Sequence, residues 1–295
     1  MDPKTAEFER HRSRLKGIGY RMLGSVGDAE DLVQETFLRW HAADADAVRV
    51  PEAWLTTAMT RLCIDRLRAS ASERAAYAGP WLPEPAVEED APDRRAELAS
   101  DLSSAFLLLL ERLAPEERAA FLLREAFDVD YAEIARTLGR SREACRQMVH
   151  RARERVRDAR PRFEVSAEAH RDLLRRYAEA ARAQDEAALL SLFAEDATFL
   201  SDGGGKVWAA RRPVHGAARI ARMLLGVARK LAGPAEERIA WINGAPGLVT
   251  LRDGRVHSTT VIETDGRRIL SMHRVLNPEK LRHAVTPAVP APSTG

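Results

Sequence analysis

The chain has 295 residues, of which 45% are hydrophobic and 31% charged, and its formal net charge is +2. This length predicts two or three domains with cores of their own, and the composition excludes a disordered or fibrous chain. Two cysteines inside expected helices, a charged N-terminus and short apolar runs indicate no metal site, cofactor, signal peptide or membrane span, so we expect a cytoplasmic protein.

Three helices are expected at the N-terminal end. Apolar residues at three-and-four spacing predict a helix over 7–24, a second from Asp28 and a third from Pro51 to about Arg68. The second helix leaves an acidic face exposed, which consists of Glu30, Asp31, Gln34 and Glu35. Acids in a first turn also occur simply because the helix dipole favours them there. Periodicity alone therefore does not make this face a binding surface.

Basic side chains project from the third helix, namely Arg61, Arg66 and Arg68. Together with Trp40 and Trp54 they fit a surface that holds a nucleic-acid backbone and stacks bases. For a lone helix, a solvated basic face is the ordinary explanation.

Residues 69–95 have poor periodicity, four prolines and a cluster of acids, which indicates a linker. Within it, Trp81-Leu82-Pro83-Glu84-Pro85 forms an apolar knob that the prolines hold extended. The knob can dock on the chain's own domain or on a partner surface.

Helices over about 95–112 and 115–127 precede a helix-turn-helix pattern. Asp130 can cap a helix that Gly139 ends, and Ser141 can cap a longer second helix. Nine arginines but only three acids lie between residues 136 and 160. This local excess favours DNA binding over a solvated basic helix, because arginine and glutamine side chains bind phosphates and base edges. The exposed face of the second helix carries Arg142, Arg146, Gln147, His150, Arg151, Arg153, Arg155 and Arg157.

Three motifs precede the helix-turn-helix in a fixed order: Asp28-Ala29-Glu30-Asp31-Leu32-Val33-Gln34-Glu35-Thr36-Phe37-Leu38-Arg39, Pro51-Glu52-Ala53-Trp54-Leu55, and Leu113-Ala114-Pro115-Glu116-Glu117-Arg118. With this order, residues 5–160 resemble a bacterial extracytoplasmic-function (ECF) sigma factor. The resemblance implies that Asp31, Gln34 and Glu35 dock on core RNA polymerase. It implies that the third helix, with Arg61, Arg66 and Arg68, holds the minus-ten element. The helix with Ser141, Arg142, Arg146, Gln147 and Arg151 would read the minus-thirty-five element, and the acidic linker would thread through the polymerase.

The C-terminal part has a different character. Helices are expected over 167–183, 185–193 and 217–231, and strands over 197–200, 207–209, 238–242, 248–251, 256–264 and 268–275. Asp253-Gly254 and Asp265-Gly266 are hairpin signals. Helices followed by a curved antiparallel meander predict an α+β cone. This part resembles the SnoaL-like domain of the nuclear-transport-factor-like superfamily.

That resemblance raises an enzyme hypothesis, because related cones house cyclases and isomerases that use Asp and His as acid and base. The candidates are Asp202, His215, His257 and His273, although single histidines on strands are more often packed or solvent-facing. We expect no catalysis. A hollow cone would instead hold a small-molecule ligand against Phe199, Trp208, Met223 and Trp241, unless these residues fill the core.

Three motifs together resemble the signature of one ECF subgroup with a fused SnoaL-like extension. They are Trp81-Leu82-Pro83 in the linker, Asp202-Gly203-Gly204-Gly205-Lys206 between two expected strands, and Asn277-Pro278-Glu279-Lys280-Leu281 after the last strand. In that subgroup the extension replaces a separate anti-sigma factor and controls both DNA-binding parts, so the resemblance implies that none is required here.

We therefore expect a multidomain chain. It has two all-α sigma domains at 1–70 and 96–160, joined by a linker at 71–95, and then an α+β SnoaL-like domain at 161–283 and a disordered tail at 284–295. The expected function is that of an ECF sigma factor, which binds core RNA polymerase and promoter DNA and is regulated in cis. Two alternatives are a ligand-sensing helix-turn-helix regulator that never enters polymerase, and a SnoaL-type enzyme fused to a DNA-binding module.

Overall fold

The computed structural model describes residues 2–44, 48–88, 103–157, 165–231, 233 and 235–284. The chain divides into two compact units, one made of residues 1–76 and 106–160 and the other of residues 77–105 and 161–295. Much of the acidic linker and the tail for which we predict disorder lie outside the described residues. The rest of the linker belongs to the second unit, together with the C-terminal part of the chain.

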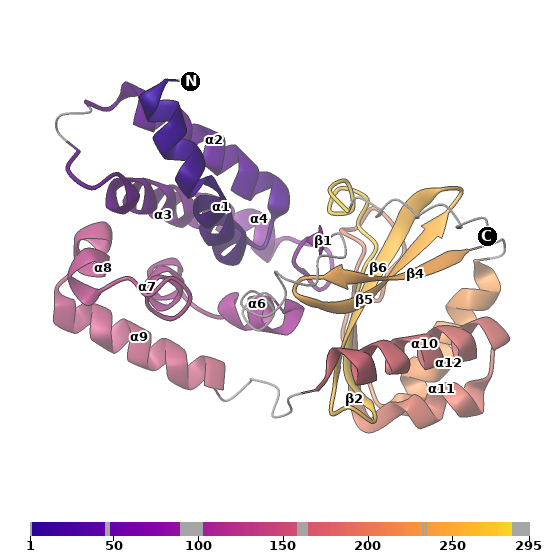
Figure 1. Ribbon diagram of the computed structural model, residues 1–295. Helices are drawn as coiled ribbons and strands as arrows, with labels where there is room; N and C mark the ends of the chain where they lie inside the picture. Colours follow the sequence, from indigo (N-terminus) through magenta and orange to yellow (C-terminus); the bar gives the residue numbers. More distant parts are fainter. Residues whose placement is uncertain are drawn as a thin grey trace. The chain divides into compact units, whose positions relative to one another are not determined.

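The first unit is helical throughout its described residues (Figure 1). Its helices are α1 (Pro3–Leu23), α2 (Val26–Ala42), α3 (Pro51–Ala69), α4 (Ala71–Ala75), α6 (Ser104–Leu110, which begins at the boundary between the units), α7 (Pro115–Glu125), α8 (Tyr131–Leu138) and α9 (Arg142–Arg157).

The predicted apolar stripes form the cores of this unit. Phe8, Leu15, Ile18 and Met22 of α1 are buried, and the Ser25 hydroxyl accepts a hydrogen bond that begins α2. Both cysteines, Cys63 and Cys145, are free and buried, as predicted. Burial raises the pKa of the Cys63 thiol, which keeps it an uncharged apolar side chain.

The second unit combines helices with one mixed sheet in the order β1-β4-β5-β6-β7-β2-β3 (Figure 1). The α+β class is therefore confirmed. Its elements are β1 (Val87–Glu88), α10 (Ala167–Ala183), α11 (Glu186–Leu192), β2 (Phe193–Asp202), β3 (Val214–His215), α12 (Ala217–Lys230), β4 (Glu236–Ile242), β5 (Ala245–Arg252), β6 (Arg255–Thr264) and β7 (Ile269–Val275).

Two predictions about this sheet are wrong. The strands do not form a purely antiparallel meander, because β2 pairs in parallel with β7, while β4 to β7 are antiparallel. Residues 207–209 form no strand, and β2 pairs instead with the short β3. The glycine loop at 202–206 therefore does not join two paired strands. It closes on itself through hydrogen bonds from the amides of Lys206 and Val207 to the Gly203 carbonyl.

The two faces of the sheet have different coverings. Helices α10 and α12 pack on one face, where Phe199, Ile262 and Met272 join the helix core. The linker covers the other face, and Val87 of β1 packs against Ile242 and its neighbours. Because strand residues alternate between faces, consecutive residues of β2 and β7 contact helices and linker in turn.

Within the described residues, no helix combines the length and apolar character needed to cross a bilayer.

Candidate nucleic-acid interface and linker cluster

The helix-turn-helix forms as its capping residues predict. The Asp130 carboxylate accepts a hydrogen bond from the Glu133 amide at 2.8 Å, and Gly139 ends α8 with a φ of 64°. The Ser141 hydroxyl accepts a hydrogen bond from the Ala144 amide at 3.1 Å and begins α9. A shared core, in which Ile134 and Val149 are fully buried, fixes the angle between the helices. Ser141 therefore acts here as a helix cap.

Arginines of α9 differ along the helix. Arg142, Arg146 and Gln147 are exposed near its N-terminal end, the end that enters the major groove in such motifs. The Arg151 guanidinium is half-exposed, and its Nε lies 3.4 Å from a carboxylate oxygen of Glu117 on α7. The N-terminal half of α9 is thus the more open part for base contacts.

The third helix does not present its arginines in isolation. Arg61 donates hydrogen bonds to the carbonyl oxygens of Thr137 and Arg136 at 3.0 and 3.1 Å, at the C-terminal end of α8. The hydroxyls of Thr57 and Thr137 lie 2.9 Å apart. We call Thr57, Arg61 and Thr137 the α8 clasp. It places a cation where the helix dipole is negative.

The other two arginines of α3 also have partners. Arg68 pairs with Glu116 on α7, and Arg66 lies 3.6 Å from Asp28. All three arginines predicted to contact the minus-ten element therefore bind carboxylates or carbonyls of the first unit. DNA would have to replace these partners.

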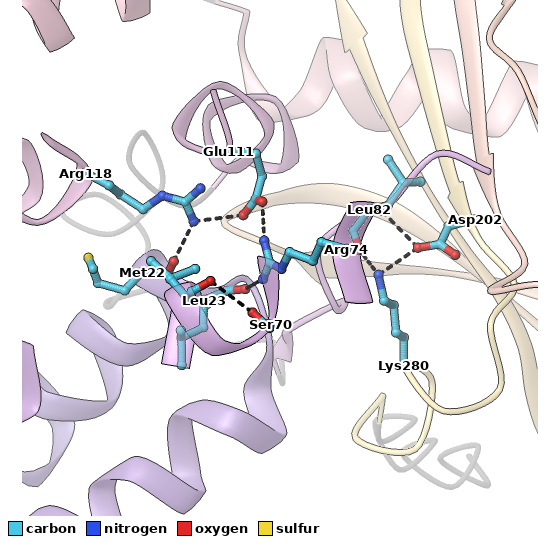
Figure 2. A network of polar contacts seen from close by, with 10 residues as sticks. Met22, Leu23, Ser70, Arg74, Leu82, Glu111, Arg118, Asp202 and Lys280 are labelled. Carbon is cyan, nitrogen blue, oxygen red and sulfur yellow. Dashed lines mark hydrogen bonds and ion pairs between the residues drawn. The ribbon is translucent and has the colours of Figure 1, made fainter. Parts of the chain in front are cut away.

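A second polar contact joins the end of α1 to α6 and α7 (Figure 2). The Arg118 guanidinium, 3% exposed, donates to the Met22 carbonyl at 2.6 Å and to Glu111 at 2.8 Å. Arg74 pairs with Glu111 and donates to the Leu23 carbonyl at 2.7 Å. Arg118 belongs to the third sequence motif, and its side chain forms buried hydrogen bonds within the first unit.

The acidic face of α2 is open. Asp31 and Gln34 are exposed, and Glu35 is half-exposed beside Arg39, 2.7 Å away. Leu38, one turn beyond Gln34, is 66% exposed, which the sequence reasoning missed. Its position outside the predicted apolar stripe of this helix could have indicated that it is exposed. Glu30 differs from the other acids, because it pairs with Arg12 and Lys16.

Three sequence motifs meet at one buried carboxylate in the second unit. The Asp202 carboxylate has no exposed surface, and its oxygens accept hydrogen bonds from the Tyr77 hydroxyl at 2.6 Å and the amides of Leu82 and Gly204 at 2.9 and 3.0 Å. The Lys280 ammonium forms the fourth contact at 2.7 Å (Figure 2). Burial, with help from the Asp202 hydrogen bond, raises the pKa of Tyr77 and keeps its proton in place.

The Lys280 ammonium is enclosed by the linker. It lies 3.9 Å from the centre of the Trp81 ring and 5.0 Å from that of Tyr77, and it also donates to the Leu82 carbonyl. These are cation–π contacts in a buried site, where they are stronger than at the surface. Tyr77 is a site residue that the sequence reasoning missed, because it lies outside any helix or strand and its partners are far away in the chain.

The rest of these motifs supports Asp202. The amides of Leu276 and Asn277 donate to its carbonyl, and the Asn277 side chain donates to the Tyr77 hydroxyl at 2.9 Å. Gly204 has a φ of 60°, and a Cβ there would lie 2.3 Å from the Asn277 amide nitrogen. We call Tyr77, Trp81, Leu82, Asp202, Asn277 and Lys280 the linker cluster.

Remaining motif residues surround the linker cluster. Pro83 and Leu281 are buried, Pro278 is exposed, and Lys206 pairs with Glu279 at the surface. Gly203 and Gly205 complete the loop, and a Cβ on Gly203 would lie 2.5 Å from the Val207 carbonyl oxygen. The loop is thus built around small residues and one buried acid.

The four acid–base candidates are dispersed. Asp202 lies in the linker cluster, and His215 is exposed beside Thr198. His273 is buried on the linker face, where burial lowers its pKa to about 4. His257 alone among them lines the large cavity of the second unit. Elsewhere in the described parts of the chain, no group of three His, Cys, Asp or Glu side chains could hold a metal ion.

That cavity has a volume of about 910 Å³ and lies between the sheet and the helices. Phe199, Trp208 and Met223 line it, as predicted for a hollow cone. Trp241 does not, and its ring instead stacks under the Arg171 guanidinium, 5.4 Å away.

Comparison with known families agrees with this architecture. Residues 8–73 match the model described as Sigma-70 region 2, and residues 103–156 match that described as Sigma-70, region 4.

The chain is 37% identical over 294 residues to the ECF RNA polymerase sigma factor SigJ of Mycobacterium tuberculosis, with 94% of this chain and 93% of that protein covered. It is 30% identical over 286 residues to a protein of the same organism named Probable ECF RNA polymerase sigma factor SigI, with 95% of each covered. The crystal structure of SigJ from that organism superposes with a TM-score of 0.74 at 36% identity, covering 95% of this chain and 98% of the other.

Proposed function

We propose a residue-level mechanism for this chain, which belongs to the ECF family of RNA polymerase sigma factors. As a sigma factor it works with core RNA polymerase and promoter DNA in transcription initiation. The proposal concerns which residues meet each partner and how the second unit controls them. We place the protein in the cytoplasm, where its polymerase is.

Core polymerase docks on the open face of α2. Asp31 and Gln34 supply exposed polar groups, and Leu38 adds an exposed apolar side chain on the same side. Exposed apolar surface rimmed by polar residues marks a site of protein–protein contact. Exchange of Leu38 for Ala is expected to weaken binding to core, and Glu9→Gln, an exposed change on α1, serves as the control.

Promoter DNA replaces the internal partners of the arginines. Arg142, Arg146 and Gln147 meet the minus-thirty-five element, with Arg151 contributing after it leaves Glu117. Arg61 and Arg68 meet the minus-ten element once α3 separates from α7 and α8, and Arg66 meets it after leaving Asp28 of α2. Because the two elements are about two helical turns of DNA apart, both parts cannot stay clasped while both elements are bound.

The second unit inhibits initiation by holding the linker. The observation that supports this most is the linker cluster, in which Asp202 and Lys280 fix both the backbone and the aromatic side chains of residues 77–82. A linker held on the sheet cannot thread through polymerase. Core polymerase and the second unit therefore compete for the same segment, and a separate anti-sigma factor is not required for this control.

The test is run-off transcription with core polymerase, using the full chain and its Asp202→Asn variant. Loss of the carboxylate charge should release the linker and raise both core affinity and transcript yield. Glu279→Gln is the matched control, because Glu279 is exposed and pairs only at the surface with Lys206. Equal transcription from the parent and the Asp202→Asn variant would contradict linker control.

We assign no catalytic role to the second unit, because its acid–base candidates lie in three different places. Its cavity instead suits a small-molecule ligand. The alternative of a DNA-binding sensor that never enters polymerase predicts duplex DNA binding without core binding, which the same Leu38 experiment distinguishes.

A further inference from the structure

Chemistry inside the large cavity of the second unit identifies the class of ligand that it would hold. The cavity lies on the helix side of the sheet, opposite the linker, and Val207, Trp208 and Leu231 are exposed at its lining. Trp208 is 71% exposed, which is unusual for a residue that also borders a cavity. Phe199, Met223 and Leu224 supply an apolar interior.

A row of polar side chains crosses the cavity floor. The strand register places Ser201 of β2 opposite Arg274 of β7, and it places Ser258 of β6 opposite Thr250 of β5, which in turn faces Glu237 of β4. All five residues line the cavity. A cavity with polar side chains on the sheet side and apolar side chains elsewhere in its lining suits a ligand with a polar end and an apolar body.

Arg274 is the central cation of this row. Its guanidinium donates hydrogen bonds to the hydroxyls of Tyr177 at 2.6 Å and Thr260 at 3.0 Å. The guanidinium carbon, Cζ, lies 5.9 Å from the centre of the Phe199 ring. Among the described residues, no carboxylate lies within ion-pair distance of Arg274. Two neutral hydroxyls orient the guanidinium, and the Glu237 carboxylate interacts with its charge from beyond ion-pair distance.

Two further side chains of the cavity lining each have one nitrogen without a partner among the described residues, although another nitrogen of Arg252 donates to the Leu231 carbonyl at 3.1 Å. The Nε of Arg252 and the Nε2 of His257 are buried and have no hydrogen-bond partner among the described residues. The register of β5 and β6 shifts next to His257, so this residue and Ser258 both reach the cavity although they are consecutive. Burial, then the charges of Arg252 and Arg274, lower the pKa of His257, which favours the neutral imidazole.

The charged side chains of the cavity lining determine which ligand charge is favoured. Four cations, Arg182, Lys230, Arg252 and Arg274, line the cavity. Glu237, which Arg182 approaches at 3.6 Å, is the one acid that lines it among the described residues. An excess of cations over acids in a partly buried site disfavours a cationic ligand and favours an anion, which can accept hydrogen bonds from these donors.

We propose that the cavity binds an organic acid whose carboxylate pairs with Arg274 and whose apolar body packs between Phe199, Met223 and Trp208. This deepens the ligand role assigned above, but the binding itself does not depend on the control of transcription.

The same residues connect the cavity to the linker cluster. The Ser201 hydroxyl accepts a hydrogen bond from the Ala210 amide at 2.9 Å, and Ser201 directly precedes Asp202. Leu276 lines the cavity, while its amide donates to the Asp202 carbonyl at 2.7 Å. An acid that moves the 207–210 segment or β7 therefore acts on the backbone that positions Asp202. The acid should loosen the linker and raise transcription, and this second step rests on the proposed linker control.

Binding is tested by calorimetry on the full chain with dodecanoate and with 1-dodecanol, which has the same apolar body without the charge. Dodecanoate should bind at least about tenfold more tightly than the alcohol, the usual size of a charge-assisted contact. Arg274→Met should abolish this preference while alcohol binding remains. Arg255→Met, an exposed arginine outside the cavity, should leave the preference unchanged.

Because Arg274 also donates a hydrogen bond to Tyr177, the Arg274→Met variant could fail to fold, so a second variant is needed. Arg252→Met should reduce the preference for the acid without changing the melting profile of the second unit. Equal binding of acid and alcohol by the parent chain, or binding of neither, would overturn the proposed ligand class. An Arg274→Met variant that folds and still prefers the acid would overturn the assigned site.

Coupling is tested separately by run-off transcription with and without dodecanoate. The parent should respond to the acid, whereas Asp202→Asn, whose linker is already free, should not. Binding without a transcriptional response would refute the coupling and leave the site intact. An Asp202→Asn variant that transcribes like the parent would instead refute linker control itself.

Discussion

The contacts between the two DNA-binding parts differ from those between the linker and the sheet. In the first unit, Arg68 is 56% exposed and its partner Glu116 26%, and Arg61 reaches only backbone carbonyls. In the second unit, the Asp202 side chain is 0% and that of Lys280 9% exposed, and every oxygen of the carboxylate has at least one donor. Exposed pairs contribute little and weaken with salt, whereas breaking a buried pair is costly.

This contrast indicates which contact opens easily. In the mechanism that we propose, promoter DNA, itself a polyanion, competes directly for arginine side chains that are about half exposed. The linker cluster offers no such exposed edge, so its release needs a competitor of high affinity or a change inside the second unit. In the proposed mechanism, the contacts within the first unit set the spacing of the two DNA-binding parts. The linker cluster sets whether the linker is free to bind core polymerase.

The largest effect is expected at the linker cluster. Asp202→Asn leaves the Lys280 ammonium buried without its counter-charge, which should cost about 3–5 kcal/mol in the stability of the second unit. Urea unfolding of the full chain, followed by the fluorescence of Trp81 and its neighbours, measures this loss. The double variant Asp202→Asn/Lys280→Met should recover part of it, and a simple sum of the two single losses would show that the pair is not coupled.

Acid should destabilise the second unit next most strongly. The pKa of His273 is about 4 in the folded protein, below its usual value of 6.5, because burial disfavours the charged imidazole. The unfolded chain therefore takes up the proton first, and stability should fall by about 3 kcal/mol as the pH drops from 6.5 towards 4. Thermal unfolding of His273→Gln should show a smaller fall, and His170, with a pKa of about 4, explains a residual slope. An unchanged slope would contradict the assignment.

Gly204→Ala should have an intermediate effect. The backbone there has a φ of 60°, and the added Cβ would displace the Asn277 side chain from Tyr77. A cost of about 1–3 kcal/mol is expected. Gly254 also has a positive φ, but no atom of the described residues would lie within 4 Å of an added Cβ there, so the difference between Gly204→Ala and Gly254→Ala isolates the contact with Asn277. Equal melting temperatures of the two variants would argue against it.

The smallest effect on stability is expected at the α8 clasp. Arg61→Ala removes two hydrogen bonds to carbonyls that water can replace, which should cost about 1 kcal/mol. Hydrogen exchange of the α8 amides should nevertheless accelerate, and high salt should accelerate it in the parent through the exposed Arg68–Glu116 pair. Arg10→Ala serves as the control, because Arg10 pairs with Glu7 within α1 and lies away from the α8 clasp. Unchanged exchange in α8 would show that the clasp does not hold the two parts together.

Local patterns in the sequence were enough for the helices. Asp130, Gly139 and Ser141 act within one or two turns of their own positions, so their capping roles could be predicted without knowing the fold. The same holds for the strands of the β4 to β7 meander, whose hairpins carry their own turn residues. The parallel pairing of β2 with β7 could not be predicted, since no local signal records which distant strand lies alongside.

The sequence by itself determined the helix-turn-helix, the acidic face of α2, the fold class of each part and the three motifs of the linker cluster. Only the tertiary structure decided that Tyr77 joins these motifs, that Arg61 and Arg68 are occupied within the first unit, and that Arg274 faces a cavity. The reason is physical. Capping and periodicity are interactions between near neighbours, whereas a hydrogen bond such as that from Asn277 to Tyr77 joins residues 200 positions apart, and its formation depends on the packing of the whole unit.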